Sequence, residues 1–129
     1  MTLGQGPRFP MRGYCQDYLT ASQARLLAVL LDADGGPVQA PALMRIAVGQ
    51  RWMLAGMRTP SGDGEALLSM ARRLERAGVD CLLVEGPIHR RTARLTALPP
   101  DWALDQIIAT LDGLRRASDL PTSRNLRTA

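Results

Sequence analysis

Four polar side chains in the middle of this 129-residue chain are spaced as neighbours on one face of a helix. They stand at positions i, i+3, i+4 and i+7 and are Ser69, Arg72, Arg73 and Arg76. Apolar residues fall on the opposite face, at Leu67, Met70, Ala71 and Leu74. Arginine carries a permanent charge and a planar fork of donors that suits phosphate oxygens and the edge of guanine. The spacing therefore predicts a helix, about residues 63–77, that presents arginines to an anionic partner.

A basic hairpin is predicted directly after this helix. Gly78 is expected to end the helix in a left-handed conformation. Two strands then follow, Cys81–Glu85 and Thr92–Leu98, joined by a turn at Gly86–Arg91. The basic residues of this unit are His89, Arg90 and Arg91 in the turn and Arg94 after it. An arginine helix beside a hairpin with a basic tip is typical of a winged helix-turn-helix, whose helix enters the major groove while the tip reaches backbone or minor groove.

The distribution of charge is compatible with an anionic partner. All 16 basic residues are arginines, a composition that a GC-rich genome also produces, and the net charge is +4. Residues 51–94 hold eight arginines and five acids, and residues 115–129 hold four arginines and one acid. Residues 95–114 between them hold three aspartates and no arginine. Basic charge is thus expected on the helix–hairpin unit and the tail.

The sequence contains few residues of the kinds that catalysis or metal binding requires. His89 is the sole histidine, and no serine has the sequence context of an activated nucleophile. Cys15 and Cys81 lie far apart without metal-ligand spacing, and Cys81 is expected to be a small core residue. We therefore expect that the protein is not an enzyme and that it binds no metal and no cofactor. With no apolar run long enough to span a membrane and no signal peptide, we expect a cytoplasmic protein that does not bind membranes.

The helices and strands expected from the sequence indicate an α+β fold that is mostly helical. We expect an irregular arm over residues 1–18, a winged helix-turn-helix domain over 19–98, a C-terminal helix over 99–117 and a disordered tail over 118–129. Thr20 and Gln23 form a capping box that starts the first helix, and Pro41 favours the start of the second. The run Arg58–Gly64 is predicted to be a loop that precedes the arginine helix.

The C-terminal helix leaves two alternatives open. Its apolar stripe is formed by Leu104, Ile107, Ile108, Leu111 and Leu114. This stripe can pack back on the domain, or it can pair with its equivalent in a second copy of the chain. Because winged-helix monomers bury little DNA surface, we expect a homodimer to which this helix contributes.

Several of these segments resemble the DNA-binding domain of the OmpR/PhoB-type response regulators. LTASQARLLAVLLDADGGPV (Leu19–Val38) is similar to that family's first helix and the crossing that follows it. SMARRLERAG (Ser69–Gly78) is similar to its recognition helix, and Cys81–Leu98 corresponds to its two wing strands. The resemblance implies that Arg72 and Arg76 hold phosphates, that Arg73 reaches base edges and that Ser69 lies close to either. The family's preceding four-stranded sheet and receiver domain have no counterpart here, so we expect a stand-alone relative.

The resulting expectation is a bacterial-type transcription regulator that binds double-stranded DNA. One alternative is a protein-interaction module of the same fold that docks a partner such as RNA polymerase. Another is a phage or plasmid replication or partition factor that binds DNA. Binding to DNA that weakens steeply with salt, yet prefers one sequence over random competitor, would favour a DNA-binding protein over the protein-interaction module.

Overall fold

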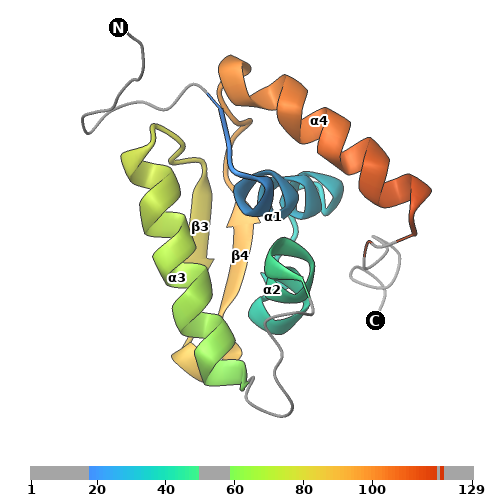
Figure 1. Cartoon of the computed structure of the whole chain (residues 1–129). Coiled ribbons are helices and arrows are strands. Elements are labelled where there is room, and N and C mark those ends of the chain that lie inside the picture. The colour runs from blue at the N-terminus through green and yellow to red at the C-terminus, as the bar shows by residue number, and fades with distance from the viewer. Residues whose placement is uncertain (1–17, 50–58, 119, 121–129) are drawn as a thin grey trace, which may run out of the picture.

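The computed structural model describes residues 18–49, 59–118 and 120, and in these residues it is a mixed α+β fold with a three-stranded antiparallel sheet (Figure 1). The order of elements is α1 (Ala21–Asp32), β2 (Val38–Gln39), α2 (Ala40–Val48), α3 (Pro60–Arg76), β3 (Leu82–Glu85), the 3-10 turn η2 (Ile88–Arg90), β4 (Thr92–Leu95) and α4 (Asp101–Arg116). Helices dominate, as predicted. The predictions for the arm and for most of the tail lie outside the described residues.

The first helix is the centre of the core. The predicted capping box is confirmed, because Gln23 N–H donates to Thr20 Oγ1 at 3.1 Å and Thr20 N–H donates to Gln23 Oε1 at 3.0 Å. From Ala24 to Leu30 nearly every side chain is buried, on all sides of the helix. A helix that is apolar all round must be covered all round. In agreement, α1 packs against α2, α4 and β4.

A single arginine of α1 fixes the second helix. The guanidinium of Arg25 donates to the carbonyl oxygens of Ile46 and Ala47 over 2.8–3.1 Å. These carbonyls belong to the last turn of α2, where the helix itself provides no donors. Pro41 lies in the first turn of α2, as predicted, and Gly49 ends the helix with φ 78°. The angle between the first two helices is thus set by hydrogen bonds as well as by packing.

The sheet corrects the expectation of a two-stranded hairpin. The short strand β2 pairs with β4, with Val38 opposite Ala93, so the strand order is β2-β4-β3. In the hairpin itself Leu82 pairs with Leu95 and Glu85 with Thr92. The second strand ends at Leu95 rather than at Leu98, and Thr96 N–H and hydroxyl then donate to the carbonyl of Cys81. A segment that follows a helix in the sequence thereby becomes an edge strand, and this joins the hairpin to the helical core.

The last helix packs on the domain in the same chain. Ala103, Ile107, Leu111 and Leu114 are buried in the core, and α4 lies along α1 (Figure 1). The amide of Gln106 accepts the N–H of Leu19 at 2.9 Å and donates to its carbonyl at 2.7 Å. These contacts hold the start of the described chain against α4. Cys81 is buried as predicted, and this burial raises the pKa of its thiol.

Candidate nucleic-acid interface

The arginine helix begins earlier than its sequence indicates. The predicted loop over Arg58–Gly64 is wrong from Pro60 onward, because α3 starts there, and Arg58 lies outside the described residues. Thr59 caps it, accepting the N–H of Gly62 at 3.0 Å, and Pro60 takes the first-turn position that tolerates a residue without N–H. Gly78, with φ 98°, ends the helix as predicted. The helix is therefore 17 residues long, and its N-terminal turns are rich in glycine.

The buried and exposed faces of α3 separate cleanly. Leu67, Met70 and Leu74 are buried in the core. On the opposite side, four exposed side chains follow one another at spacings of four, three and four residues, and we call them the crest of α3. The crest consists of Glu65, Ser69, Arg72 and Arg76. Arg73 is exposed as well, but it is rotated from Arg72 by about 100° and lies on one flank of the crest.

The hairpin turn packs against the N-terminal half of this helix. Gly64 lies so close to the backbone of Ile88 that an added Cβ would approach the Ile88 carbonyl oxygen to 2.1 Å. Glycine at this position therefore permits α3 and η2 to touch. Within the turn, Gly86 has φ 91°, and the Arg90 N–H donates to the Pro87 carbonyl at 2.8 Å. The turn is held on the helix instead of projecting freely from it.

The four basic residues of the hairpin have different surroundings. His89 and Arg90 are exposed at the turn. Arg91 is half-buried and makes long hydrogen bonds of 3.4 Å to the carbonyl oxygens of Gly86 and Gly64. Arg94 forms an ion pair with Glu85, with 3.5 Å between its Nε and a carboxylate oxygen. Of the four hairpin residues predicted to contact DNA, Arg91 and Arg94 therefore also brace the hairpin, whereas His89 and Arg90 make none of these internal side-chain bonds.

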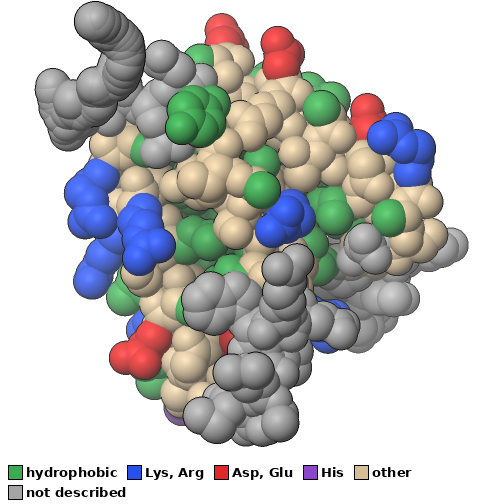
Figure 2. Space-filling model, viewed as in Figure 1, with side chains coloured by type: hydrophobic (Ala, Val, Ile, Leu, Met, Phe, Trp, Pro, Cys, Tyr) green, Lys and Arg blue, Asp and Glu red, His purple; other side chains and the backbone are tan. Residues whose placement is uncertain are grey.

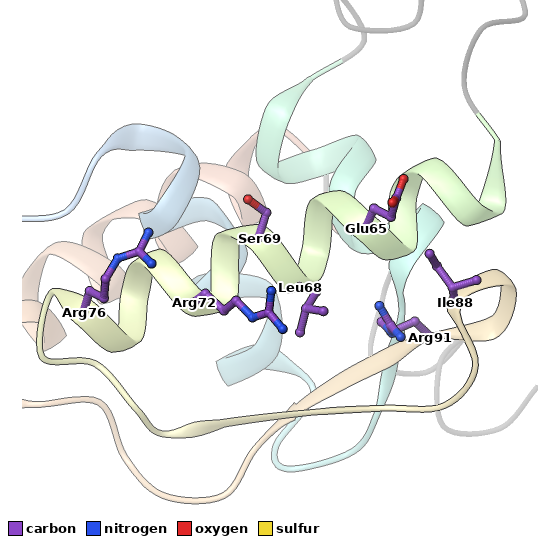
Figure 3. A pocket seen from close by; sticks show the side chains of 7 residues that line it. All are labelled: Glu65, Leu68, Ser69, Arg72, Arg76, Ile88 and Arg91. Atoms are coloured by element: carbon purple, nitrogen blue, oxygen red, sulfur yellow. The ribbon is translucent and has the colours of Figure 1, made fainter.

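Helix and hairpin together form an open groove of about 500 Å³. The crest lines one side, and Leu68, Ile88 and Arg91 complete it. Figure 3 shows the side chains of Arg72 and Arg91 extending toward one another on either side of Leu68. Arg73 does not line the groove. The structure thus brings Ser69, Arg72, Arg76 and Arg91 to one surface, and it separates Arg73 and Arg94 from that surface.

Charge of opposite sign occupies two parts of the surface. Figure 2 shows arginine side chains gathered over the C-terminal half of α3, whereas acidic side chains project from α4. The exposed acids of α4 are Asp101, Asp105 and Asp112. The last turn of α4 also carries the exposed Arg115 and Arg116, so a polyanion would be attracted to the arginines of α3 and repelled from the acidic part of α4 that precedes that turn.

The predicted dimer stripe on α4 divides between core and surface. Ile107, Leu111 and Leu114 are buried within the chain and Leu104 is half-buried, whereas Ile108 is 43% exposed. On the helix surface, Ile108 has Asp105 and Asp112 as its neighbours three and four residues away. Of the predicted stripe, Ile108 and the edge of Leu104 are therefore the parts left exposed for pairing two copies. The homodimer stays a prediction.

The sequence reasoning missed three residues of this surface, Glu65, Leu68 and Ile88. Glu65 precedes Ser69 by four residues and Arg72 by seven, so it extends the same stripe by one turn. Glu65 already lies within the helix predicted over about residues 63–77, but the prediction considered its basic and hydroxyl side chains and not the carboxylate. Leu68 and Ile88 come together only because the turn folds back on the helix.

Among the described residues, no group of histidines, cysteines and acids could hold a metal ion. None of the helices described is long and apolar enough to cross a membrane. Comparisons of the chain with protein-family models, with curated proteins and with solved structures find no match.

Proposed function

We propose that this chain is a winged helix-turn-helix protein that binds double-stranded DNA and recognises its sequence, as a transcription regulator does. The observation that carries the proposal is the groove of α3 and the hairpin, which is lined by the exposed Arg72 and Arg76 and the half-buried Arg91. The order of helices and strands, and a sheet in which β2 joins the hairpin, agree with such a domain. On this proposal the fold is related to the OmpR/PhoB-type effector domains.

In this arrangement α3 enters the major groove, which is wide enough to admit one helix. Its exposed face meets bases and phosphates, while His89 and Arg90 at the hairpin turn reach the adjacent backbone. Arg76 and Gly64 are separated by about 18 Å along the helix axis. The hairpin turn packs at the Gly64 end, so the basic groups extend along the helix instead of meeting at one point. The contact surface is therefore elongated, as binding along a duplex requires.

The electrostatic asymmetry of the molecule gives this surface an orientation. Asp101, Asp105 and Asp112 make the part of α4 that precedes its last turn repel phosphates. Binding is expected to depend steeply on salt, because each phosphate neutralised by an arginine releases counterions. Phosphate contacts from Arg73, Arg76 and Arg90 alone would give a slope of log K against log salt of roughly −3.

The test is binding of the purified full chain to fluorescently labelled duplexes across a salt series, with unlabelled random duplex as competitor. Anisotropy that rises with protein, falls with salt and survives random competitor for a selected sequence supports the proposal. If random duplex competes away binding equally for all labelled sequences, the chain binds DNA but does not recognise its sequence. If no duplex is bound at low salt, the proposal is wrong and the interaction module becomes the better reading.

A further inference from the structure

One carboxylate stands among the arginines of the crest. Glu65 is exposed, lines the groove and lies on the same stripe as Ser69 and Arg72. Within the described residues its carboxylate has neither a hydrogen bond nor an ion pair, although three arginines line the same groove. Figure 3 shows Glu65 and Ser69 on the side of α3 away from the hairpin, with Leu68 on the side that faces it. Glu65 is therefore available to a ligand.

A free carboxylate is unfavourable on a surface that meets phosphates. It repels the backbone of every duplex and gains nothing from counterion release. Its compensation in the major groove is a base that offers a hydrogen-bond donor, and the N4 amino group of cytosine is the one that glutamate typically accepts. A residue that lowers affinity for most sequences and raises it for one provides specificity.

Position on the helix separates base contacts from phosphate contacts. When a helix lies in the major groove, its most exposed line of side chains points at the bases and its flanks point at the two backbones. Glu65 and Arg72 are on that line and are separated by about 10 Å along the axis, which corresponds to roughly three base pairs. Arg73 is on the flank opposite Leu68, where it meets a phosphate.

We propose that Glu65 and Arg72 are the residues that determine which DNA sequence is bound, with Glu65 accepting from a cytosine and Arg72 donating to a guanine. This inference rests on the DNA-binding function proposed above. Ser69 lies between the two and contacts one of the intervening base pairs or the adjacent backbone. The assignment differs from the one that the family resemblance implies, in which Arg73 reaches the bases.

The experiment is selection of bound duplexes from a random library by the full chain and by four variants, followed by affinity measurements on the selected site. The variants are Glu65→Ala, Glu65→Gln, Glu75→Ala and Arg73→Ala. Glu75 is the matched control, since it is an exposed glutamate of the same helix that does not line the groove. Circular dichroism and thermal unfolding verify that each variant remains folded.

The expected result is a change in base preference at one position only for the Glu65 variants. Glu65→Ala should lower discrimination for cytosine there by about 5- to 100-fold and tighten binding to random duplex. Glu65→Gln should shift the preference at that position toward adenine, because an amide presents both a donor and an acceptor. Glu75→Ala and Arg73→Ala should keep the selected sequence, and Arg73→Ala should weaken all duplexes alike.

Two failures are distinguishable. If the wild-type chain selects a sequence and the Glu65 variants select the same one with equal discrimination, this inference is overturned while the proposed function stands. The same conclusion follows if Arg73→Ala is the variant that changes the sequence. If the wild-type chain selects nothing, the proposed function fails as well.

Discussion

The two longest helices, α3 and α4, differ almost entirely on their outer faces. They contain 17 and 16 residues, and each buries a stripe of large aliphatic side chains in the same core. Outside, α3 carries Arg72, Arg73 and Arg76 together with Glu65 and Glu75, whereas α4 carries three aspartates and, in its last turn, Arg115 and Arg116. Because the buried stripes meet the same packing requirement, they stabilise the fold in similar ways. The exposed charge favours a polyanion at the arginines of α3 and disfavours one at the aspartates of α4.

The largest effect is expected from the two adjacent isoleucines of α4. Ile107 is fully buried, so Ile107→Ala should lower the free energy of unfolding by about 2–5 kcal/mol in urea denaturation. Ile108 is 43% exposed, and at a concentration at which the chain is a monomer Ile108→Ala should change this free energy by less than about 0.5 kcal/mol. Equal losses of unfolding free energy in both variants would mean that Ile108, on the outer face of α4, is buried as well.

The homodimer is tested on the same helix. Light scattering at micromolar concentration should give the mass of two chains, and Ile108→Asp should give a folded monomer. A wild-type monomer under these conditions would show that the homodimer prediction is wrong.

Glycines in the two helices are expected to respond in opposite directions. Gly64→Ala in α3 should destabilise the chain by about 1–3 kcal/mol, because the new Cβ meets backbone atoms of Ile88. Gly113→Ala in α4 should stabilise it by up to about 1 kcal/mol, because an added Cβ there has no atom within 4 Å and alanine favours helix. Chemical denaturation measures both. A harmless Gly64→Ala would show that helix and hairpin are not in close contact.

For DNA binding, Arg90 in the hairpin and Arg116 at the end of α4 form a matched pair of exposed arginines. Arg90→Ala should reduce the slope of log K against log salt by about one unit, as the loss of one phosphate contact does. Arg116→Ala should leave the slope unchanged, because α4 faces away from the duplex. The same reduction in both variants would indicate a general effect of net charge.

The smallest effects concern two ion pairs, one near each helix. Arg115 of α4 contacts Asp32 at 3.0 Å, and the Asp32 side chain is 10% exposed. Arg94 contacts Glu85 at 3.5 Å, with the two side chains 38% and 53% exposed. Double-mutant cycles should give a coupling of about 0.2–1 kcal/mol for Arg94–Glu85 and a larger one for Arg115–Asp32, where water screens less. A reversed order would contradict this view of burial.

Much of the fold could be predicted from local patterns. The capping box of Thr20, the start of α2 near Pro41 and the left-handed Gly78 each depend on neighbours in sequence, and each is confirmed. The start of α3 could not be predicted in this way. A run such as Pro60–Gly64 is typical of a turn, and its helical state depends on the Thr59 cap and on close packing against Ile88.

The candidate site was predictable in its residue types but not in its arrangement. Helical spacing placed Arg72 and Arg76 on one face correctly. The contacts of Arg91 with Gly64 and of Arg94 with Glu85 depend on how the hairpin folds back and on its register. Those are properties of the tertiary structure, so a list of basic residues could not separate bracing arginines from free ones. The resemblance to a family supplied an expectation for Arg73 that the geometry of the crest does not favour.

The most direct test of the central claim compares the wild-type chain with a variant in which Arg72, Arg73 and Arg76 are all alanine. Both are titrated onto the same selected duplex over a salt series, and unfolding curves verify that the two chains are equally stable. We expect the variant to lose its sequence preference, through Arg72, and about two units of salt slope, through the phosphate contacts of Arg73 and Arg76. A variant that binds with the affinity, slope and preference of the wild type would contradict the claim that α3 is the DNA-binding helix.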